Sequence, residues 1–211
     1  MNIVQFERRS CQMNTVITSR EAILNASRQL VKTEGWQAVS IRQVAAACGV
    51  SVGSIYNYFD SKSDLTAATV ESIWHDIFHF PGQEAGFTCF SDCVGWIFDR
   101  LREGGEEYPG FFTVHSTMDF LGDGEKGGKG EEEKARKENA KQRMMQSWEH
   151  IQKELGAVLA KDQKVRPGVF NDILTPQKFT EIIFSLIISA LIRHNYDDSA
   201  VLELVRRTLY G

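Results

Sequence analysis

The segment from Ser40 to Phe59 constrains the fold most, because it holds two short helix patterns separated by a single glycine turn. Ser40 followed by Gln43 is a capping box, so the sequence predicts that the first short helix begins there and ends at Gly49. Ser51 predicts the start of the second short helix. Two helices joined by a tight, glycine-containing turn are the layout of a helix-turn-helix.

Apolar residues recur at helical spacing along the rest of the chain, and no strand pattern of comparable quality occurs. We therefore expect an all-α protein of about nine helices, with an N-terminal three-helix helix-turn-helix domain followed by a larger helical domain. The expected helices cover about residues 18–34, 40–48, 51–59, 61–80, 90–103, 110–121, 134–166, 175–194 and 198–209. The glycine-rich, polar stretch at 122–134 is expected to be a flexible loop.

Composition excludes several classes of protein. The chain has 211 residues, of which 42% are hydrophobic and 25% charged, and no apolar run approaches the length of a membrane span. Residues 1–14 lack the apolar stretch of a signal peptide, and four cysteines are too few for a disulfide framework. We expect a soluble, cytoplasmic protein in a reducing compartment.

Charge is distributed unevenly along the chain. Residues 1–64 carry seven Lys or Arg against five Asp or Glu, a net charge of +2, whereas the whole chain carries −4 and the remainder therefore −6. This asymmetry makes the first third of the chain the candidate for a polyanionic partner, although a charge of this size is only a weak signal.

Metal sites and enzymatic chemistry find little support. Cys89 and Cys93, and likewise His75 and His79, have the four-residue spacing that can hold a metal on one helix face, but neither pair has an evident third ligand. No nucleophile elbow, phosphate loop or HExxH motif occurs in the sequence. We expect no metal, no cofactor and no enzyme activity, with the cysteines serving as small core residues.

Residues 22–65 carry a resemblance to a known family. Its motifs are Gly35, Ser40-Ile41-Arg42-Gln43-Val44-Ala45, Cys48-Gly49-Val50-Ser51, Ile55-Tyr56-x-Tyr58-Phe59 and Ser61-Lys62-x-x-Leu65. Together they resemble the N-terminal DNA-binding domain of the tetracycline-repressor (TetR) family of bacterial regulators. This sequence departs from the family where Ser63-Asp64 replaces an acidic residue directly after the lysine, and where Ile55 replaces the common leucine.

The resemblance implies a set of DNA-binding residues: Ser40, Arg42, Ser51, Val52, Gly53, Ser54, Tyr56, Asn57, Tyr58 and Lys62. The resemblance places Arg42 against the duplex. It places Val52, Gly53, Tyr56 and Asn57 toward the bases, and Ser54, Tyr58 and Lys62 toward phosphates. An asparagine amide can read an adenine edge, so Asn57 is the expected base reader. Alternatively, Ser40 and Ser51 serve purely as helix caps, and Tyr58 packs its ring between the first and fourth helices.

The resemblance also implies a domain plan: an N-terminal arm over 1–14, a DNA-binding domain over 15–64 and an effector-binding and dimerisation domain over 65–211. In the family the effector lies among helices four to eight, which makes Trp74, Phe78, Trp96, Phe112, His115, Met118 and Trp148 the expected lining residues. Few charges occur in this set, so we expect an apolar or aromatic small molecule with one or two polar groups. The alternative is that these aromatic residues are core anchors.

The helix expected over 175–194 is apolar nearly all round, which is more than one intramolecular face can bury. We therefore expect a homodimer through the last two helices, with Phe179, Ile183, Leu186, Ile187, Ala190, Val201, Leu204 and Val205 at the interface.

The function that the resemblance implies is a homodimeric, ligand-responsive transcriptional regulator, most simply a repressor. It would bind double-stranded DNA at a near-palindromic operator and be released by a small-molecule effector. Two alternatives come from other classes: a DNA-bound helical module that mainly engages a protein partner, and an enzyme with an incidental helix-turn-helix.

Overall fold

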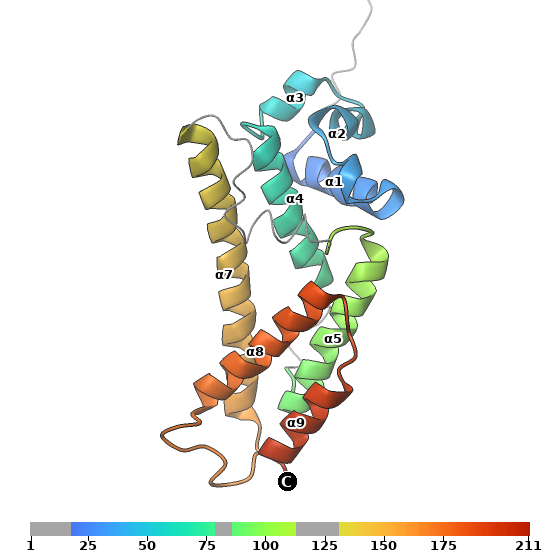
Figure 1. Ribbon diagram of the computed structural model, residues 1–211. Helices are drawn as coiled ribbons and strands as arrows, with labels where there is room; N and C mark the ends of the chain where they lie inside the picture. Colours follow the sequence, from blue (N-terminus) through green and yellow to red (C-terminus); the bar gives the residue numbers. More distant parts are fainter. Residues whose placement is uncertain (1–17, 79–85, 113–130) are drawn as a thin grey trace, which may run out of the picture.

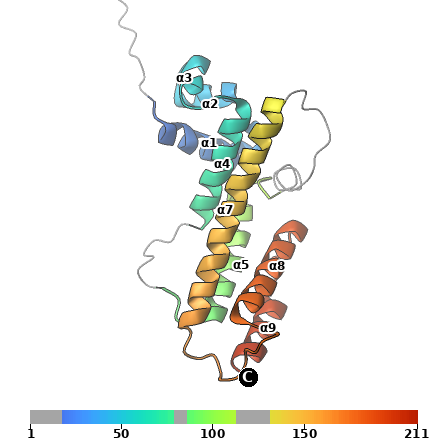
Figure 2. The ribbon, with the colours of Figure 1, turned by 90° about the vertical axis from the view of Figure 1, so that its left-hand side faces the viewer.

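The protein is all-α in the computed structural model, which describes residues 18–78, 86–112 and 131–211. Its helices are α1 (Arg20–Glu34), α2 (Ile41–Cys48), α3 (Val52–Tyr56), α4 (Lys62–Ile77), α5 (Phe90–Glu107), α7 (Glu131–Lys161), α8 (Pro176–Arg193) and α9 (Ser199–Leu209), with a 3-10 turn at Trp36–Ala38. Figure 1 shows α1 to α3 at one end of the molecule, with α5, α8 and α9 at the other. Helices α4 and α7 run lengthwise between the two ends (Figure 2). The expected all-α fold is confirmed.

Serine side chains start each helix at the α1–α4 end. Ser19, Ser40, Ser51 and Ser61 each accept a hydrogen bond from the backbone N–H three residues later, at 3.1 to 3.3 Å. Gly49 ends α2 in the left-handed conformation, with φ of 67°, which a residue with a Cβ adopts only at a cost. Local signals therefore determine the helix boundaries that the sequence analysis located here.

Helix α7 differs from expectation at both of its ends. Helix α7 begins at Glu131, inside the stretch expected to be a loop, because residues 131–133 are all glutamate and favour a helix N-terminus. It ends at Lys161, ahead of the expected break near Pro167, because the next residue turns away from the helix. That residue, Asp162, accepts hydrogen bonds from the backbone N–H groups of Phe90 and Lys164.

Helix α5 runs past the expected stop at Gly104-Gly105 and ends at Glu107. Residues 109–112 form a turn, and the remainder of the helix expected over 110–121 lies outside the described residues. Gly104 is needed for packing here, because a Cβ at this position would lie 2.9 Å from the side chain of Ile77. Helices α4 and α5 therefore approach each other closely at this point.

A single apolar core continues from one end of the molecule to the other. Ile23, Val44, Ile55 and Phe59 are fully or almost fully buried among the first three helices, and Leu65 joins them from α4. Further along α4, Ile73 and Ile77 are buried with residues of α5. Helix α4 is thus part of both ends of the molecule.

Within the described ranges, no helix combines the length and apolar character needed to cross a bilayer.

Candidate nucleic-acid interface

The outer face of α3 exposes apolar and aromatic side chains. Val52 is 40% exposed and Tyr56 50% exposed, whereas Ile55 between them is completely buried in the core. Asn57 follows directly after the helix and is also exposed. None of the residues that the structure describes covers this surface, which is typical of a surface that binds a partner.

Gly53 lies in the middle of this face. Its φ is not in the left-handed region, and a Cβ placed on it would have only the Ser51 hydroxyl within 4 Å, at 3.7 Å. The fold of the protomer therefore does not require glycine here. The absence of a side chain leaves the α3 backbone open to close approach from outside.

Four of the expected DNA-binding hydroxyl groups, those of Ser40, Ser51, Ser54 and Tyr58, have partners within the protomer. Ser40 and Ser51 cap α2 and α3, and the Ser51 and Ser54 hydroxyls lie 2.9 Å apart. The Tyr58 hydroxyl donates to the Thr18 carbonyl at 2.6 Å. A phenol has one proton to donate, so in this arrangement Tyr58 has none left for a phosphate.

Arg42 and Lys62 are the exposed cations of the expected set. Arg42 lies in the first turn of α2, and Lys62 is the first residue of α4. Both side chains project from the ends of helices beside α3 and can reach phosphates along a bound duplex.

Arg20 also shapes this surface, although the sequence analysis did not single it out. Its guanidinium donates to the Tyr58 carbonyl at 3.2 Å and lies 4.5 Å from the centre of the Phe59 ring. It thereby holds the end of α3 against the start of α1. The partners are separated by 38 positions, so no local pattern indicates the contact.

Four of the expected effector residues come together in an aromatic cluster. Trp74 stacks on Phe78 at 5.8 Å between ring centres and contacts Phe112 at 5.4 Å, and Phe78 contacts Trp96 at 6.0 Å. Trp148 contacts Phe184 of α8 instead, at 6.3 Å. His115 and Met118 lie outside the described residues.

A cavity of about 280 Å³ lies beside this cluster. It is lined by Arg102, Gly105, Glu106, Tyr108, Gly110, Phe112, His194 and Tyr196. Among the described residues the buried Tyr196 hydroxyl has no hydrogen-bond partner, and burial raises its pKa. Tyr196 was not among the expected effector residues, because nothing in the sequence of a polar loop indicates that a tyrosine hydroxyl there is buried.

The residues expected at a dimer interface divide between the core and the surface. Phe179, Ile183, Ile187 and Val205 are buried inside the protomer and cannot face a second copy. Leu186, Ala190 and Val201 are half-buried, and Leu204 is 44% exposed. The apolar residues that α8 does expose are Ile182, at 47%, and Ile192, at 39%.

The cysteine pair lies in the interior. Burial raises the pKa of Cys93 to about 12, so this thiol stays protonated at neutral pH. Cys89 is buried at the start of α5, with its sulfur 3.2 Å from the hydroxyls of Ser91 and Tyr210. Among the described residues, no three His, Cys, Asp or Glu side chains gather in a way that could hold a metal ion.

Comparison with known proteins identifies relatives of the N-terminal region. Residues 23–69 match the family model described as bacterial regulatory proteins, tetR family. Rv0681, an uncharacterized HTH-type transcriptional regulator of Mycobacterium tuberculosis, is 27% identical over 105 residues, which are 50% of this chain and 48% of that protein. UidR, an HTH-type transcriptional regulator of Escherichia coli, is 33% identical over 52 residues, 25% of this chain and 26% of UidR. The chain therefore spans about half the length of the first relative and about a quarter of the second.

Solved structures share the fold over most of the chain. The reduced form of NemR from Escherichia coli has a TM-score of 0.55 at 16% identity and covers 90% of this chain and 97% of its own. A TetR transcription regulator from Haloarcula marismortui has a TM-score of 0.51 at 22% identity, covering 89% and 92%. EbrR, a multidrug binding protein complexed with imidazole, has a TM-score of 0.51 at 16% identity, covering 91% and 95%. At these identities the similarity establishes the fold alone.

Proposed function

Because the chain belongs to the TetR family of transcriptional regulators, we propose that it binds a near-palindromic operator as a homodimer and releases it when a small molecule occupies the helical domain. The observation that carries this proposal is the outer face of α3, where Val52, Gly53, Tyr56 and Asn57 are exposed and not covered by any part of residues 18–78, 86–112 and 131–211. In this proposal residues 15–64 bind DNA, residues 65–211 bind the effector and the second copy, and residues 1–14 form an arm.

Helix α3 is proposed to enter the major groove. Asn57 would pair its amide with an adenine edge, while Val52 and Tyr56 contact bases and Gly53 lets the backbone approach. Arg42 and Lys62 would bind phosphates on either side. Ser40, Ser51 and Tyr58 support this surface through their contacts within the protomer rather than by touching DNA.

The proposed dimer contact is the outer face of α8 together with α9, which lie on the same side of the bundle (Figure 2). Ile182 and Ile192 are exposed on α8 with Ser185 between them, and Leu204 is exposed on α9. An exposed apolar face with small serines suits close packing against its own copy across a two-fold axis.

The effector is proposed to be aromatic, with one hydrogen-bonding group. It would contact Phe112 and neighbouring rings of the aromatic cluster and use the cavity beside them, where the Tyr196 hydroxyl has no partner in the part of the chain that the structure describes. A buried phenol lacking a partner favours a ligand that supplies one. EbrR, described as multidrug binding, shares this helical scaffold.

The test begins with selection of duplexes from a random DNA pool by the wild-type protein. Selected sequences should contain two half-sites related by two-fold symmetry, and Asn57→Ala should relax the preference at one position in each. Selection of no common sequence would contradict the proposal and favour the alternative in which the helical domain mainly engages a protein partner.

The dimer is tested by replacing Ile182 and Leu204 together with glutamate. Both side chains are exposed, so the protomer should stay folded, and light scattering should change from dimer to monomer. Glu149→Lys is the matched control, because it reverses a charge at an exposed position of α7, outside the proposed contact. A dimer that survives the double replacement would place the contact elsewhere.

A further inference from the structure

Four side chains form a polar cluster where α1 meets the ends of α4 and α5. Lys32 of α1 donates to Glu107 at 2.6 Å and to Asp76 of α4 at 3.3 Å. The Tyr108 hydroxyl, directly after α5, donates to the same Asp76 oxygen, and the Lys32 ammonium lies 4.7 Å from the centre of the Tyr108 ring. These residues, Lys32, Asp76, Glu107 and Tyr108, are called the junction cluster.

Backbone and ring contacts also join the residues after α5 to α4 and to the 3-10 turn that follows α1. The Trp36 N–H donates to the Pro109 carbonyl at 3.0 Å, and the Trp36 ring contacts Phe111 at 5.7 Å. Phe111 in turn contacts Trp74 of α4 at 5.5 Å. The residues that follow α5 are therefore fastened to the DNA-binding end at several points.

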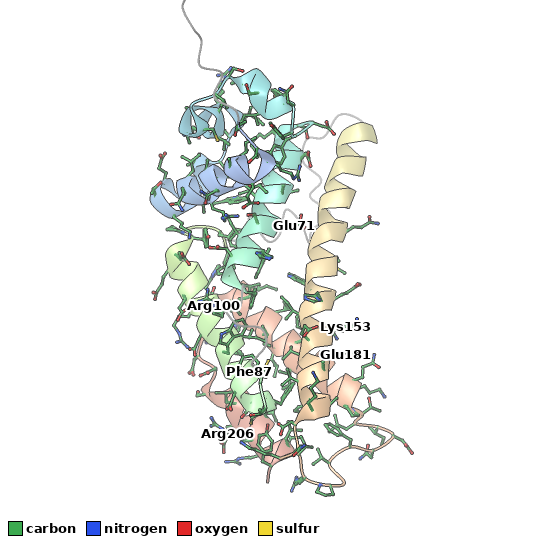
Figure 3. All side chains as sticks on the ribbon, turned by 180° about the vertical axis from the view of Figure 1, so that it is seen from behind. Glu71, Phe87, Arg100, Lys153, Glu181 and Arg206 are labelled. Carbon is green, nitrogen blue, oxygen red and sulfur yellow. The ribbon has the colours of Figure 1, made fainter. Side chains whose placement is uncertain are left out.

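The C-terminal end of α4 also contacts α5. Arg100, labelled in Figure 3, donates from its Nε to the Ile77 carbonyl at 2.6 Å. Gly104 lets the Ile77 side chain approach the α5 backbone. Helix α4 and the end of α5 thus form one unit, against which α1 is held by Lys32.

Lys32 and its acidic partners stabilise one another's charged forms. Burial acts to lower the pKa of Lys32, but hydrogen bonds with Glu107 and Tyr108 outweigh it and raise this pKa above its usual value. Burial acts to raise the pKa of Asp76, but the hydrogen bond from Tyr108 and the charge of Lys32 lower it instead. Arg28, which also bonds Ser72 of α4, adds a second positive charge facing Asp76. The cation and the carboxylate are both ionised at neutral pH.

Fold stability alone is a poor explanation for this cluster. Ile23 and Val31 of α1 are completely buried in the core of the first domain, so α1 has its own packing there. Lys32 and Asp76 keep 24% and 39% of their side chains exposed, and pairs at such positions contribute little stability. Together with the Trp36–Pro109 hydrogen bond, they fix the direction of α1 relative to the end of α5.

We propose that the junction cluster is a positioning element for DNA recognition, which sets the half-site spacing that the protein accepts. The inference rests on the homodimer of the proposed function. If the two copies meet on α8 and α9, each α3 stands at the far end of α4, a helix of 16 residues and so roughly 24 Å long. A small tilt at the junction moves both α3 helices, and two half-sites are read together only near one helical repeat, roughly 34 Å.

The test uses Tyr108→Phe, which keeps the buried ring and removes only the hydroxyl that bonds Asp76. The probes are the duplex selected by the wild-type protein and duplexes with one or two base pairs added or removed between its half-sites. Wild type should strongly prefer the selected spacing. The variant should lose about fivefold or more of that preference, while the salt dependence of binding stays the same because phosphate contacts are retained.

The matched control is Tyr210→Phe. Tyr210 donates to Asp162 at 2.6 Å, so the same type of bond is lost, but at the end of α5 remote from α1. This control should keep the wild-type spacing preference. Asp76→Asn is the second test variant and replaces Tyr108→Phe if that protein does not fold.

Each outcome decides the matter. An unchanged spacing preference in both Tyr108→Phe and Asp76→Asn overturns the inference but leaves the proposed function standing. Equal losses in Tyr108→Phe and Tyr210→Phe also overturn it, because they would reflect general loosening. A wild-type protein with no spacing preference contradicts the dimeric function itself and the inference with it.

Discussion

A tyrosine–aspartate hydrogen bond lies at each end of α5, but the two bonds connect different parts of the molecule. At its C-terminal end Tyr108 donates to Asp76, and near its N-terminal end Tyr210 donates to Asp162. The Tyr210–Asp162 bond joins the start of α5, the end of α7 and the end of α9. The Tyr108–Asp76 bond lies where α1 meets the ends of α4 and α5. The elements that a contact connects, rather than its chemistry, determine whether it stabilises the fold or orients a binding surface.

The largest expected effect is at the end of α5 remote from α1. Asp162 is buried and accepts hydrogen bonds from the Tyr210 hydroxyl and from the Phe90 and Lys164 N–H groups. Asp162→Ala leaves buried donors without a partner and should lower the unfolding free energy by about 2–4 kcal/mol. Urea unfolding measures this loss. The half-site preference of the remaining folded protein should match wild type, and a changed preference would break the distinction between the two ends.

Next in size is an overpacking change at the end of α5 near α1. Gly104→Ala places a methyl group 2.9 Å from Ile77 and should destabilise the protein by about 1–3 kcal/mol. Because it pushes α4 away from α5, operator affinity should fall as well. Gly156→Ala in α7 is the matched control: nothing lies within 4 Å of its added Cβ, so it should stabilise the protein by about 0.5–1 kcal/mol. Thermal unfolding and fluorescence anisotropy with the selected duplex give both readouts.

A smaller effect is expected at the DNA surface itself. Lys62→Ala should weaken binding by a similar factor on all sequences and lower the salt slope by roughly one unit, as for one lost phosphate contact. Lys164→Ala, at an exposed position beside Asp162, is the control and should leave the slope unchanged. A salt slope that Lys62→Ala does not alter would remove this lysine from the interface.

The smallest effect concerns acid stability, to which both ends contribute in the same direction. Burial opposes ionisation of Asp76 and Asp162, but the hydrogen bonds from their tyrosine partners outweigh it and lower both pKa values. A carboxyl group with a lowered pKa stabilises the folded state above its unfolded pKa, about 3.9, and this contribution is lost as pH falls through the folded value. Urea unfolding between pH 6 and about 3 should therefore show a decline that Asp76→Asn and Asp162→Asn each make shallower. Identical slopes in wild type and variants would show that neither pair is linked to protonation.

The helix-turn-helix was predictable because its signals are local. The serines at positions 40, 51 and 61 each cap the helix that begins at the next residue, and Gly49 supplies the left-handed conformation in the turn between α2 and α3. The candidate DNA surface follows from the same pattern, because burying Ile55 and Phe59 leaves Tyr56 and Asn57 outside. The sequence does not indicate that the Tyr58 hydroxyl donates a hydrogen bond to the carbonyl of Thr18, 40 positions away.

From α5 onward, apolar periodicity predicted that helices exist but not which face of each helix is buried. Helix α8 is apolar almost all round, so the pattern could not separate Ile183, which is buried in the protomer, from Ile182, which is exposed. Both are isoleucine, and only the position of α7 against one side of α8 distinguishes them. The same limit applies to the aromatic residues, of which Trp74 and Phe112 meet while Trp148 packs on Phe184.

By itself the sequence determined an all-α chain and the position of its helix-turn-helix, because caps, turns and helical spacing act between residues a few positions apart. Tertiary structure alone decided that Lys32 meets Glu107 across 75 positions and that Tyr108 reaches Asp76 across 32. Such pairs leave no periodic trace, since any lysine and any glutamate look alike until packing of the apolar core brings particular ones together.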